Sequence, residues 1–516
     1  MAEANSAPLT IGGKPLTGGM LWLAALVLAA ANFVAVLDMT IANVSVPSIA
    51  GNLGATTSQG TWVITSYAVA EAISVPLTGW LAARFGAVRV FSVAMGLFGV
   101  ASLLCGMANS LGFLVFARIL QGFAGGPLMP LSQTLLLRIF PPRMAPAAIG
   151  LWSMTTLIAP VLGPIVGGWI CDNYSWHWIF LINIPVAIGC AFAAWNLLRR
   201  YELALRRNPI DTVGLGLLIV WVGALQLMLD EGKNLDWFAS PTIVVLAVVA
   251  AVGFAAFLIW ELHEEHPIVD LRVFRHRGFT MSVLTISLTF AAFFAANVLT
   301  PLWLQSFMGY TATDSGMVTA WTGLFALCVA PMAAGLSAKV DPRRLIFAGV
   351  LWLGLMTFWR TVATTDMDYW DIALPLMFMG FGLPFFFIPT TGLALASVEP
   401  QEMDNAAGLM NFLRTLSGAA AVSLVNTAWE DGTTRQHAEL VGLTDRSGEV
   451  LQGLKASGMS PDAALSALDQ LLTSQSVMLA TNEIMFTIAI CFVVGACVIW
   501  LAPKPTRVVE PGAGGH

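Results

Sequence analysis

Long apolar runs, separated by short polar segments, follow one another along nearly the whole chain. Fourteen of them are long enough to cross about 30 Å of hydrocarbon as α-helices. The pattern therefore predicts an all-α polytopic membrane protein with about 14 transmembrane helices. The predicted spans cover 20–45, 60–82, 88–108, 111–137, 145–170, 178–198, 212–229, 241–262, 280–307, 314–338, 344–363, 372–397, 405–428 and 483–502.

The composition supports this interpretation and excludes several other classes. Of the 516 residues 57% are hydrophobic and only 10% charged, whereas soluble domains carry about a quarter charged residues. Basic residues are few and dispersed, so no nucleic-acid partner is expected. The six cysteines lie mostly inside apolar runs and the six histidines are scattered, which argues against a metal site. A glycine loop for phosphate binding is also missing, so ATP is not the expected energy source.

The lysines and arginines are unevenly distributed between the polar segments. With the N-terminus inside the cell, seventeen of the 24 lie in inside segments and four in outside segments. The other three, Arg118, Arg360 and Arg414, fall within spans. This asymmetry is typical of the positive-inside rule. Because the number of spans is even, both termini are predicted to be cytoplasmic.

Three charged residues lie within spans of the first half of the chain: Asp38, Glu71 and Arg118. An arginine at the middle of a bilayer helix costs at least about 3 kcal/mol, so Arg118 needs a partner, a wet cavity or both. Burial makes a carboxyl group hold its proton more tightly, and a nearby arginine has the opposite effect. We predict that the three residues couple transport to protons, with Asp38 the first candidate for the proton carrier and Glu71 the second. The alternative is a static structural ion pair.

Arg414, in the thirteenth span, is flanked by small residues that permit close helix contact. It could serve an anionic substrate or a structural pair, and the sequence does not rank these roles. Arg360 lies near the outer end of its helix, where a snorkelling structural role is the better interpretation. A cavity for varied hydrophobic compounds should be mostly apolar and aromatic. Its candidate polar contacts, besides Arg414, are Asn32, Asn297, Gln305 and Asn411.

The fifth span is unusually rich in helix-perturbing residues. It contains Pro160 and Pro164, each of which removes a backbone hydrogen bond, and Gly163, Gly167 and Gly168, which permit bending and tight packing. We predict that this helix is a hinge or a seal between two halves of the protein.

A weak internal repeat supports such halves. The segments Gly79–Arg89 and Gly335–Arg344 follow the second and tenth spans, and both place glycine at a helix end before basic residues. Duplicated helix sets are common in transporters. The predicted organisation is an N-terminal tail 1–19, a six-helix bundle 20–200, two inserted helices 201–265, a second six-helix bundle 266–503 and a C-terminal tail 504–516.

The longest connection outside the membrane covers 430–478 and belongs to the second bundle. Within it, Pro461–Val477 has apolar residues at helical spacing. This predicted helix either caps the outer face or forms a docking surface for a partner, and the sequence favours neither.

Four segments together resemble motifs of the major facilitator superfamily, specifically its fourteen-helix drug:proton antiporter branch. Leu37–Pro47 resembles the first-helix motif of that branch, and Gly79–Arg89 resembles the loop motif of the superfamily. Arg118–Gly126 resembles the fourth-helix motif R-x-x-Q-G. Ala159–Trp169 resembles the antiporter motif G-x-x-x-G-P-x-x-G-G, which is associated with exporters. The residues expected to act in conformational change are Gly79, Arg84, Gly86, Arg89, Gly163, Pro164, Gly167 and Gly168.

The resemblance covers nearly the whole chain and implies a multidrug exporter. Such a protein exchanges protons for hydrophobic drugs and toxicants by alternating access, is driven by the proton motive force and needs no cofactor. The resemblance also implies a bacterial inner-membrane location, with a periplasmic adaptor of the EmrA type and an outer-membrane channel of the TolC type as partners. One departure concerns the loop motif, where Ala83 replaces the aspartate of the usual inter-helix charge latch.

Three other functions can be weighed against export of many drugs. A substrate-specific exporter of one metabolite or siderophore would have the same fold and differ in its competition profile. A non-transporting receptor or scaffold is compatible with the long outer connection. A membrane enzyme would need a nucleophile, a base or a metal cluster near the membrane surface, and the sequence shows none.

Overall fold

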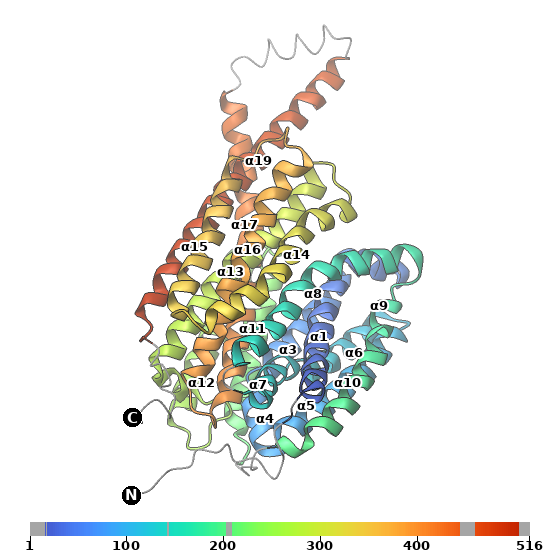
Figure 1. The fold of residues 1–516 in the computed structure, drawn as a ribbon. Helices are drawn as coiled ribbons and strands as arrows, with labels where there is room; N and C mark the ends of the chain where they lie inside the picture. Colours follow the sequence, from blue (N-terminus) through green and yellow to red (C-terminus); the bar gives the residue numbers. More distant parts are fainter. Residues whose placement is uncertain (1–15, 17, 142–143, 203–208, 444–459, 505–516) are drawn as a thin grey trace, which may run out of the picture.

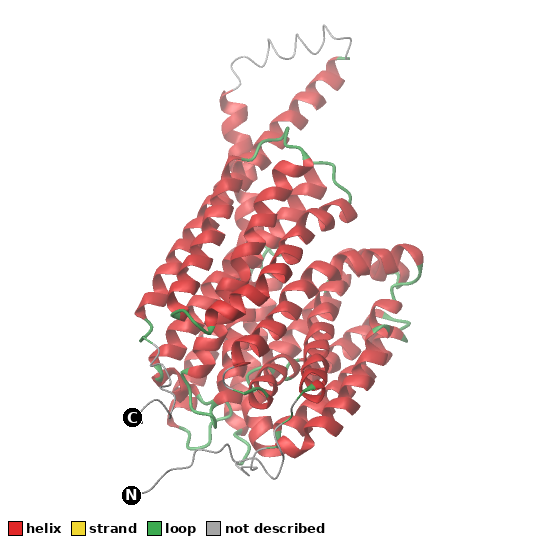
Figure 2. Cartoon of the chain, in the orientation of Figure 1, coloured by secondary structure: helices red, strands yellow, loops and turns green. Residues whose placement is uncertain are grey.

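The computed structural model describes residues 16, 18–141, 144–202, 209–443 and 460–504, and this part of the chain is built from helices and connecting turns (Figure 2). The first half comprises α1 (Gly19–Asn52), α2 (Thr57–Gly60), α3 (Trp62–Ser74), α4 (Thr78–Phe85), α5 (Ala87–Gly106), α6 (Leu111–Gly125), α7 (Leu128–Ile139), α8 (Ala145–Asn173), α9 (Trp178–Leu181), α10 (Asn183–Leu198) and η2 (Arg199–Tyr201). The middle comprises α11 (Thr212–Glu231), η3 (Trp237–Ala239), α12 (Pro241–His263) and η4 (Leu271–Arg275). The second half comprises α13 (Arg277–Phe307), α14 (Ala312–Ser337), α15 (Pro342–Trp359), η5 (Arg360–Val362), α16 (Tyr369–Ala396), α17 (Met403–Leu443), α19 (Pro461–Val498) and η6 (Ile499–Leu501).

The predicted membrane spans correspond to these helices. In the described part of the chain, twelve helical segments are long and apolar enough to cross a membrane, and the bent helix α8 adds a thirteenth. The remaining predicted span, 60–82, is divided into α3 and α4 by a turn at Val75–Leu77. Pro76 stands in this turn and has no backbone N–H to donate. The all-α polytopic fold is therefore confirmed.

The helices of each half pack mainly against one another. In the first half α1 packs on α8 and α10, α3 on α6, and α5 on α10 and α6. In the second half α13 packs on α17 and α19, and α16 on α14 and α15. Figure 1 shows the two sets as separate groups, blue to green and yellow to red. The residue boundaries of the domains given above stay a prediction.

The two halves meet along a limited set of helices. Helix α8 packs on α14 and α16, while α4 and α7 pack on α17. The middle helix α11 packs on α12 and α3. We call the lower end of Figure 1, where α1 begins and α17 begins, the terminal end of the molecule.

The described residues of the predicted connection 430–478 belong almost entirely to two long helices. Helix α17 continues to Leu443, and α19 already begins at Pro461 and runs on into the last span, so the helix predicted over Pro461–Val477 is confirmed. The two helices form a hairpin that projects away from the terminal end (Figure 1). Trp429 Nε1 donates to Thr481 Oγ1 at 2.9 Å, which helps to hold them together. Residues 444–459 lie outside the described part, and the choice between a cap and a docking surface stays open.

Candidate functional site: buried charges between the helices

Asp38 of α1 and Arg118 of α6 form an ion pair in the interior of the first half. Arg118 Nη1 lies 2.6 Å from Asp38 Oδ2, and neither side chain is exposed. A buried ion pair leaves both groups without water, so its stability depends on further hydrogen bonds to each partner. The structure thus pairs Asp38, the first candidate for the proton carrier, with Arg118.

Three neighbours provide these hydrogen bonds. Gln121 Nε2 and Asn183 Nδ2 donate to Asp38 Oδ1 at 2.9 and 2.6 Å. Arg118 Nε donates to the Val63 carbonyl at 3.0 Å, and Nη1 donates to Gln121 Oε1 at 2.8 Å. The carboxylate therefore receives bonds from helices α6 and α10, and the guanidinium is held by α3 and α6. A change at either charge affects the packing of several helices at once.

Aromatic rings cover the arginine of this pair. The guanidinium carbon of Arg118 lies 4.1 Å from the centre of the Tyr67 ring and 5.5 Å from that of Phe180. Gly122, one turn after Arg118, allows α6 to approach α3 closely, because a Cβ at this position would lie 2.4 Å from the Tyr67 carbonyl oxygen. The close approach keeps Tyr67 against the guanidinium and excludes water from the pair.

Glu71, the second-choice carboxyl, lies on α3 one turn after Tyr67 and is half-buried. Its carboxylate has no hydrogen bond or ion pair to any residue that the structure describes. Glu71 is therefore outside the hydrogen-bonded network of Asp38 and Arg118.

Arg414 of α17 lies on the opposite side of this arrangement, where the two halves meet. It is buried and has aromatic rings from α8, α13 and α16 around its guanidinium. One turn earlier, Asn411 Nδ2 donates to Gln133 Oε1 of α7 at 3.0 Å. Both residues are thus at a contact between halves, as a substrate-binding role requires.

The remaining polar candidates for substrate binding differ in whether they contact another helix. Asn32 of α1 is buried and donates to Thr155 and Thr156 of α8 at 2.8 and 2.9 Å. Asn297 instead donates to the Phe293 carbonyl of its own helix, and Gln305 is exposed near the end of α13. Asn32 therefore lies among contacts between helices, whereas the contacts of Asn297 and Gln305 connect them to none of the other candidates.

The antiporter motif places α8 directly on α1, next to Asp38. A Cβ at Gly163 would lie 2.2 Å from Thr40 Oγ1, and Thr40 Oγ1 donates to the Ala159 carbonyl at 3.3 Å. Helix α8 bends by 43° between Ala145–Pro160 and Ile165–Cys171. Gly167 is buried, Gly168 has open space around it, and the side chain of Pro164 lies outside the described residues. The role of hinge or seal stays a prediction.

The loop motif holds the start of α5 through a residue that the sequence analysis did not identify. The Glu202 carboxylate accepts hydrogen bonds from the backbone N–H groups of Val88 and Arg89, both at 3.2 Å. Gly86 has φ of +96°, and a Cβ there would lie 2.5 Å from the Glu202 carboxylate. Burial raises the pKa of Glu202, while these two donors and the charge of Arg138 oppose the shift. Nothing in the local sequence marks Glu202, because its partner segment is more than a hundred residues away.

A charge contact between the halves is present despite Ala83. Arg138 at the end of α7 pairs with Asp404 in the first turn of α17, and both are mostly buried. Beside it, a Cβ at Gly79 of α4 would lie 2.7 Å from the Asn405 Cα atom. We call Arg138, Asp404, Gly79 and Asn405 the terminal latch. Arg84, the other basic residue of the loop motif, lies over the Trp80 and Phe85 rings.

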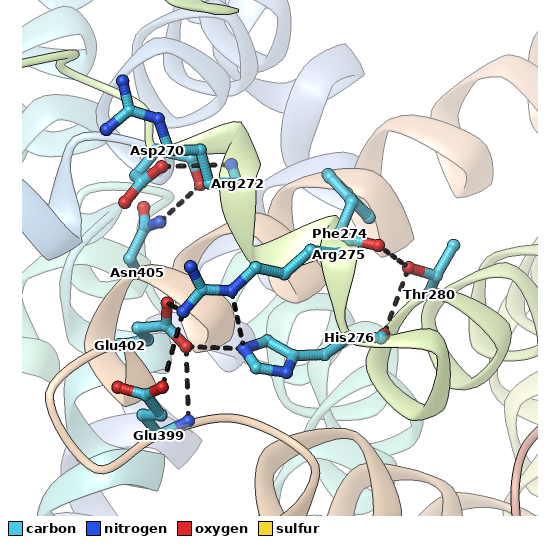
Figure 3. Close-up of polar contacts among 9 residues, drawn as sticks. All are labelled: Asp270, Arg272, Phe274, Arg275, His276, Thr280, Glu399, Glu402 and Asn405. Atoms are coloured by element: carbon cyan, nitrogen blue, oxygen red, sulfur yellow. Dashed lines mark hydrogen bonds and ion pairs between the residues drawn. The ribbon is translucent and has the colours of Figure 1, made fainter. Parts of the chain in front are cut away.

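Further polar contacts fix the start of α17, which contributes Asp404 and Asn405 to the terminal latch (Figure 3). Asn405 Nδ2 donates to the Asp270 carbonyl at 2.7 Å. Nearby, Glu402 pairs with Arg275 at 2.8 Å and lies 2.8 Å from His276 Nε2. The beginning of α17 is therefore held to the segment before α13, so the latch connects the whole second half to α4 and α7.

We expect that breaking the terminal latch opens this end of the protein. Replacing Arg138 by glutamine should cost about 1.5 kcal/mol, a roughly tenfold shift, because a charge-assisted hydrogen bond between the halves is lost. Hydrogen–deuterium exchange should become faster at the start of α17 and in α4. Asp404→Asn should have the same effect.

The reversed pair, Arg138→Asp with Asp404→Arg, is the control. It should restore slow exchange if the charge contact holds the halves together. Equal exchange in all four proteins would contradict a latch.

The apolar helices, the buried pair and the contacts between the halves together define a multi-pass membrane protein with charged groups enclosed among its helices. Residues 28–422 match the family model of the Major Facilitator Superfamily. The chain belongs to this superfamily, whose members are transporters. The fold agrees: the proton:xylose symporter XylE superimposes with a TM-score of 0.59 over 94% of this chain and 96% of that one, at 13% identity.

Two relatives are similar over almost their entire length. Fatty acid resistance protein FarB of Neisseria gonorrhoeae is 44% identical over 97% of this chain and 99% of its own. Multidrug export protein EmrB of Escherichia coli (strain K12) is 42% identical over 98% of this chain and 99% of its own. The resemblance to the superfamily is thereby confirmed, and within the superfamily the similarity is to exporters of the EmrB type.

Proposed function

We propose that this protein is a proton-coupled antiporter that exports hydrophobic drugs and toxicants by alternating access. The observation that carries the proposal is the buried pair of Asp38 and Arg118 inside a transporter fold. Such a pair is costly to enclose, and in membrane helices it marks ion or proton pathways. The names of the relatives EmrB and FarB support export of hydrophobic and amphipathic compounds.

The geometry suggests how a proton would act on the fold. A proton taken up from outside neutralises Asp38, and the carboxyl group then no longer holds the charge of Arg118. Arg118 keeps its bonds to Val63 and Gln121, so the contact that weakens is the one from α6 to α1. Release of the proton to the inside restores the pair, and the proton gradient thereby drives one full cycle.

The movement would be transmitted by the close contact of α1 with α8. Asp38 lies two residues before Thr40, which packs on Gly163 of the antiporter motif. Helix α8 in turn packs on α14 of the second half. A shift of α1 would thus reach the interface between the halves, where the terminal latch must open for substrate to enter from the cytoplasm.

We further propose that the protein is the inner-membrane component of a tripartite efflux pump with both termini in the cytoplasm. Its partners would be a periplasmic adaptor of the EmrA type and an outer-membrane channel of the TolC type. The similarity to EmrB over nearly the full length supports this assembly, and the excess of basic residues in one set of segments supports the orientation. The α17–α19 hairpin would then project toward the adaptor.

The test of proton coupling is proton release from the purified protein. A hydrophobic drug is added at weakly buffered neutral pH, and a pH indicator reports the protons set free. Competition between drug and proton predicts release that saturates with the drug. Binding of the drug without any release would contradict direct competition at these carboxyls, and a receptor or scaffold would also give none.

A further inference from the structure

Arg414 is a buried cation that has no counter-ion among the described residues. Its side chain is 1% exposed, and it forms no ion pair with any acidic residue that the structure describes. Its one hydrogen bond within that part runs from Nη2 to the Met129 sulfur at 2.6 Å, and thioether sulfur is a weak acceptor. Nε and Nη1 have no partner at all among the described residues.

Arg118, the other fully buried arginine in the described part of the chain, has quite different surroundings. Arg118 has a carboxylate, an amide oxygen and a backbone carbonyl as acceptors, from Asp38, Gln121 and Val63. Leaving a buried charge without such partners is strongly destabilising. An arginine in the situation of Arg414 therefore fits a site that is completed by a ligand of negative charge.

The surroundings of Arg414 are aromatic and come from both halves of the protein. The guanidinium carbon lies 4.9 Å from the ring centre of Phe290 in α13, 5.4 Å from Phe387 in α16 and 5.7 Å from Trp152 in α8. Trp152 and Phe387 are stacked, with ring centres 5.9 Å apart. Ring faces attract a cation but accept no strong hydrogen bond, so they leave the two free nitrogens available. They also offer apolar area for a ligand that carries a hydrocarbon part.

Buried hydrogen-bonding atoms that have no partner in the described part of the chain also occur on the helix that carries Arg414 and on helices that contact it. Asn411 Oδ1 of α17 and Gln133 Nε2 of α7 are two of them, although the other ends of these two amides are bonded to each other. Ser153 Oγ, which follows Trp152 on α8, is also buried without a partner among the described residues. Buried polar atoms are normally hydrogen-bonded, so unused ones on the helices around a buried charge support a site for a polar group.

Glu71 does not complete the site. The Glu71 carboxylate forms no hydrogen bond or ion pair with the Arg414 guanidinium. Arg414 is therefore left without a carboxylate partner among the residues that the structure describes.

We propose that Arg414 binds the negatively charged head group of an amphipathic organic anion, such as the carboxylate of a medium-chain acid, and that Phe290, Phe387 and Trp152 contact its adjoining hydrocarbon. The inference rests on the proposed export function and names the class of substrate that this site selects. An anion here would form charge-assisted hydrogen bonds with Nε and Nη1, which are among the strongest that a protein makes. Because both halves contribute to the walls, such a substrate would be released when the halves separate.

The test compares two ligands of the same chain length. The full-length protein is purified in a neutral detergent, and binding of sodium decanoate and of decanol is measured by quenching of tryptophan fluorescence. Wild type should bind decanoate about tenfold more tightly than decanol or better, because only the anion bonds to the guanidinium. Equal affinities in wild type would overturn the proposal without any variant.

The variants assign the discrimination to Arg414. In Arg414→Gln the preference for decanoate should disappear while decanol binding persists, and Arg414→Lys should keep part of the preference. Arg360→Gln is the matched control, since Arg360 is a partly buried arginine of the second half that is hydrogen-bonded to Thr300, and it should retain the preference. A preference that survives in Arg414→Gln would place the anion elsewhere.

A further experiment distinguishes a site for a substrate from a site for a lipid head group. Wild type in nanodiscs of neutral lipid and of anionic lipid should show the same affinity for decanoate, and weaker binding in anionic lipid would assign the site to a lipid head group. No proton gradient enters these measurements, so they remain valid if proton release fails. Conversely, if wild type showed no preference for decanoate but still released protons when a drug binds, only the role of Arg414 would be rejected.

Discussion

Replacing Asp38 by asparagine is expected to abolish proton-driven export and to leave drug binding in place. Asparagine has the same size as aspartate and can still accept the bonds from Gln121 and Asn183, but it cannot take up or release a proton. In vesicles with an imposed pH gradient, drug transport should fall to the rate of protein-free vesicles. Exchange of labelled for unlabelled drug, which needs no net proton movement, should continue.

Two comparisons make this prediction specific. Glu71→Gln removes the other carboxyl, which is outside the hydrogen-bonded network, and should retain proton-driven transport at a reduced rate. If Glu71→Gln abolished transport and Asp38→Asn did not, Glu71 would be the carrier. If Asp38→Asn merely lowered thermal stability and transported normally per folded molecule, the pair with Arg118 would be a structural ion pair.

Replacing Gly122 by alanine is expected to destabilise the first half strongly. The added methyl carbon would lie 2.4 Å from the Tyr67 carbonyl oxygen and 2.9 Å from Ala70 Cβ, so α6 and α3 would have to separate. Overpacking of this kind costs about 1–3 kcal/mol, and more where the obstacle is backbone. Tyr67 would also move away from Arg118, whose ring contact is 4.1 Å. The midpoint of thermal unfolding in detergent should fall by several degrees, and proton release should weaken with it.

Gly112 on the same helix provides the control. A Cβ at Gly112 meets no atom within 4 Å, and alanine is favoured over glycine in a helix by about 0.5–1 kcal/mol. Gly112→Ala should therefore unfold at the wild-type temperature or slightly above it. Equal behaviour of the two alanine variants would show that α3 and α6 are not in close contact in the membrane.

The sequence alone predicted that Arg118 pairs with an acidic residue, but it did not predict which one. A guanidinium in an apolar helix requires an acidic partner, and only Asp38 and Glu71 were available in nearby spans. Which of them forms the pair depends on how α1 and α3 are rotated against α6, and rotation is set by packing. Gln121 stood in the R-x-x-Q-G motif and could have been assigned, whereas Asn183 comes from α10 and has no signal of its own.

The terminal latch and the Arg414 site could not have been found from the sequence. Arg138 was counted only as a basic residue of an inside loop, and its partner Asp404 lies 266 positions away. The rings around Arg414 come from three helices, and each looks like an ordinary apolar residue of a span. Such contacts arise only when the two halves are placed against each other.

By itself the sequence determined which segments cross the membrane, because the free energy of placing a helix in a bilayer depends on the apolar content of that helix alone. It also determined that the charges at Asp38, Arg118 and Arg414 need a function or a partner, for the same reason. Only the tertiary structure decided that Arg118 has an acidic partner and that Arg414 has none among the described residues. Helix rotation and contact between distant segments depend on the shapes of all the packed side chains together, and no local pattern contains that information.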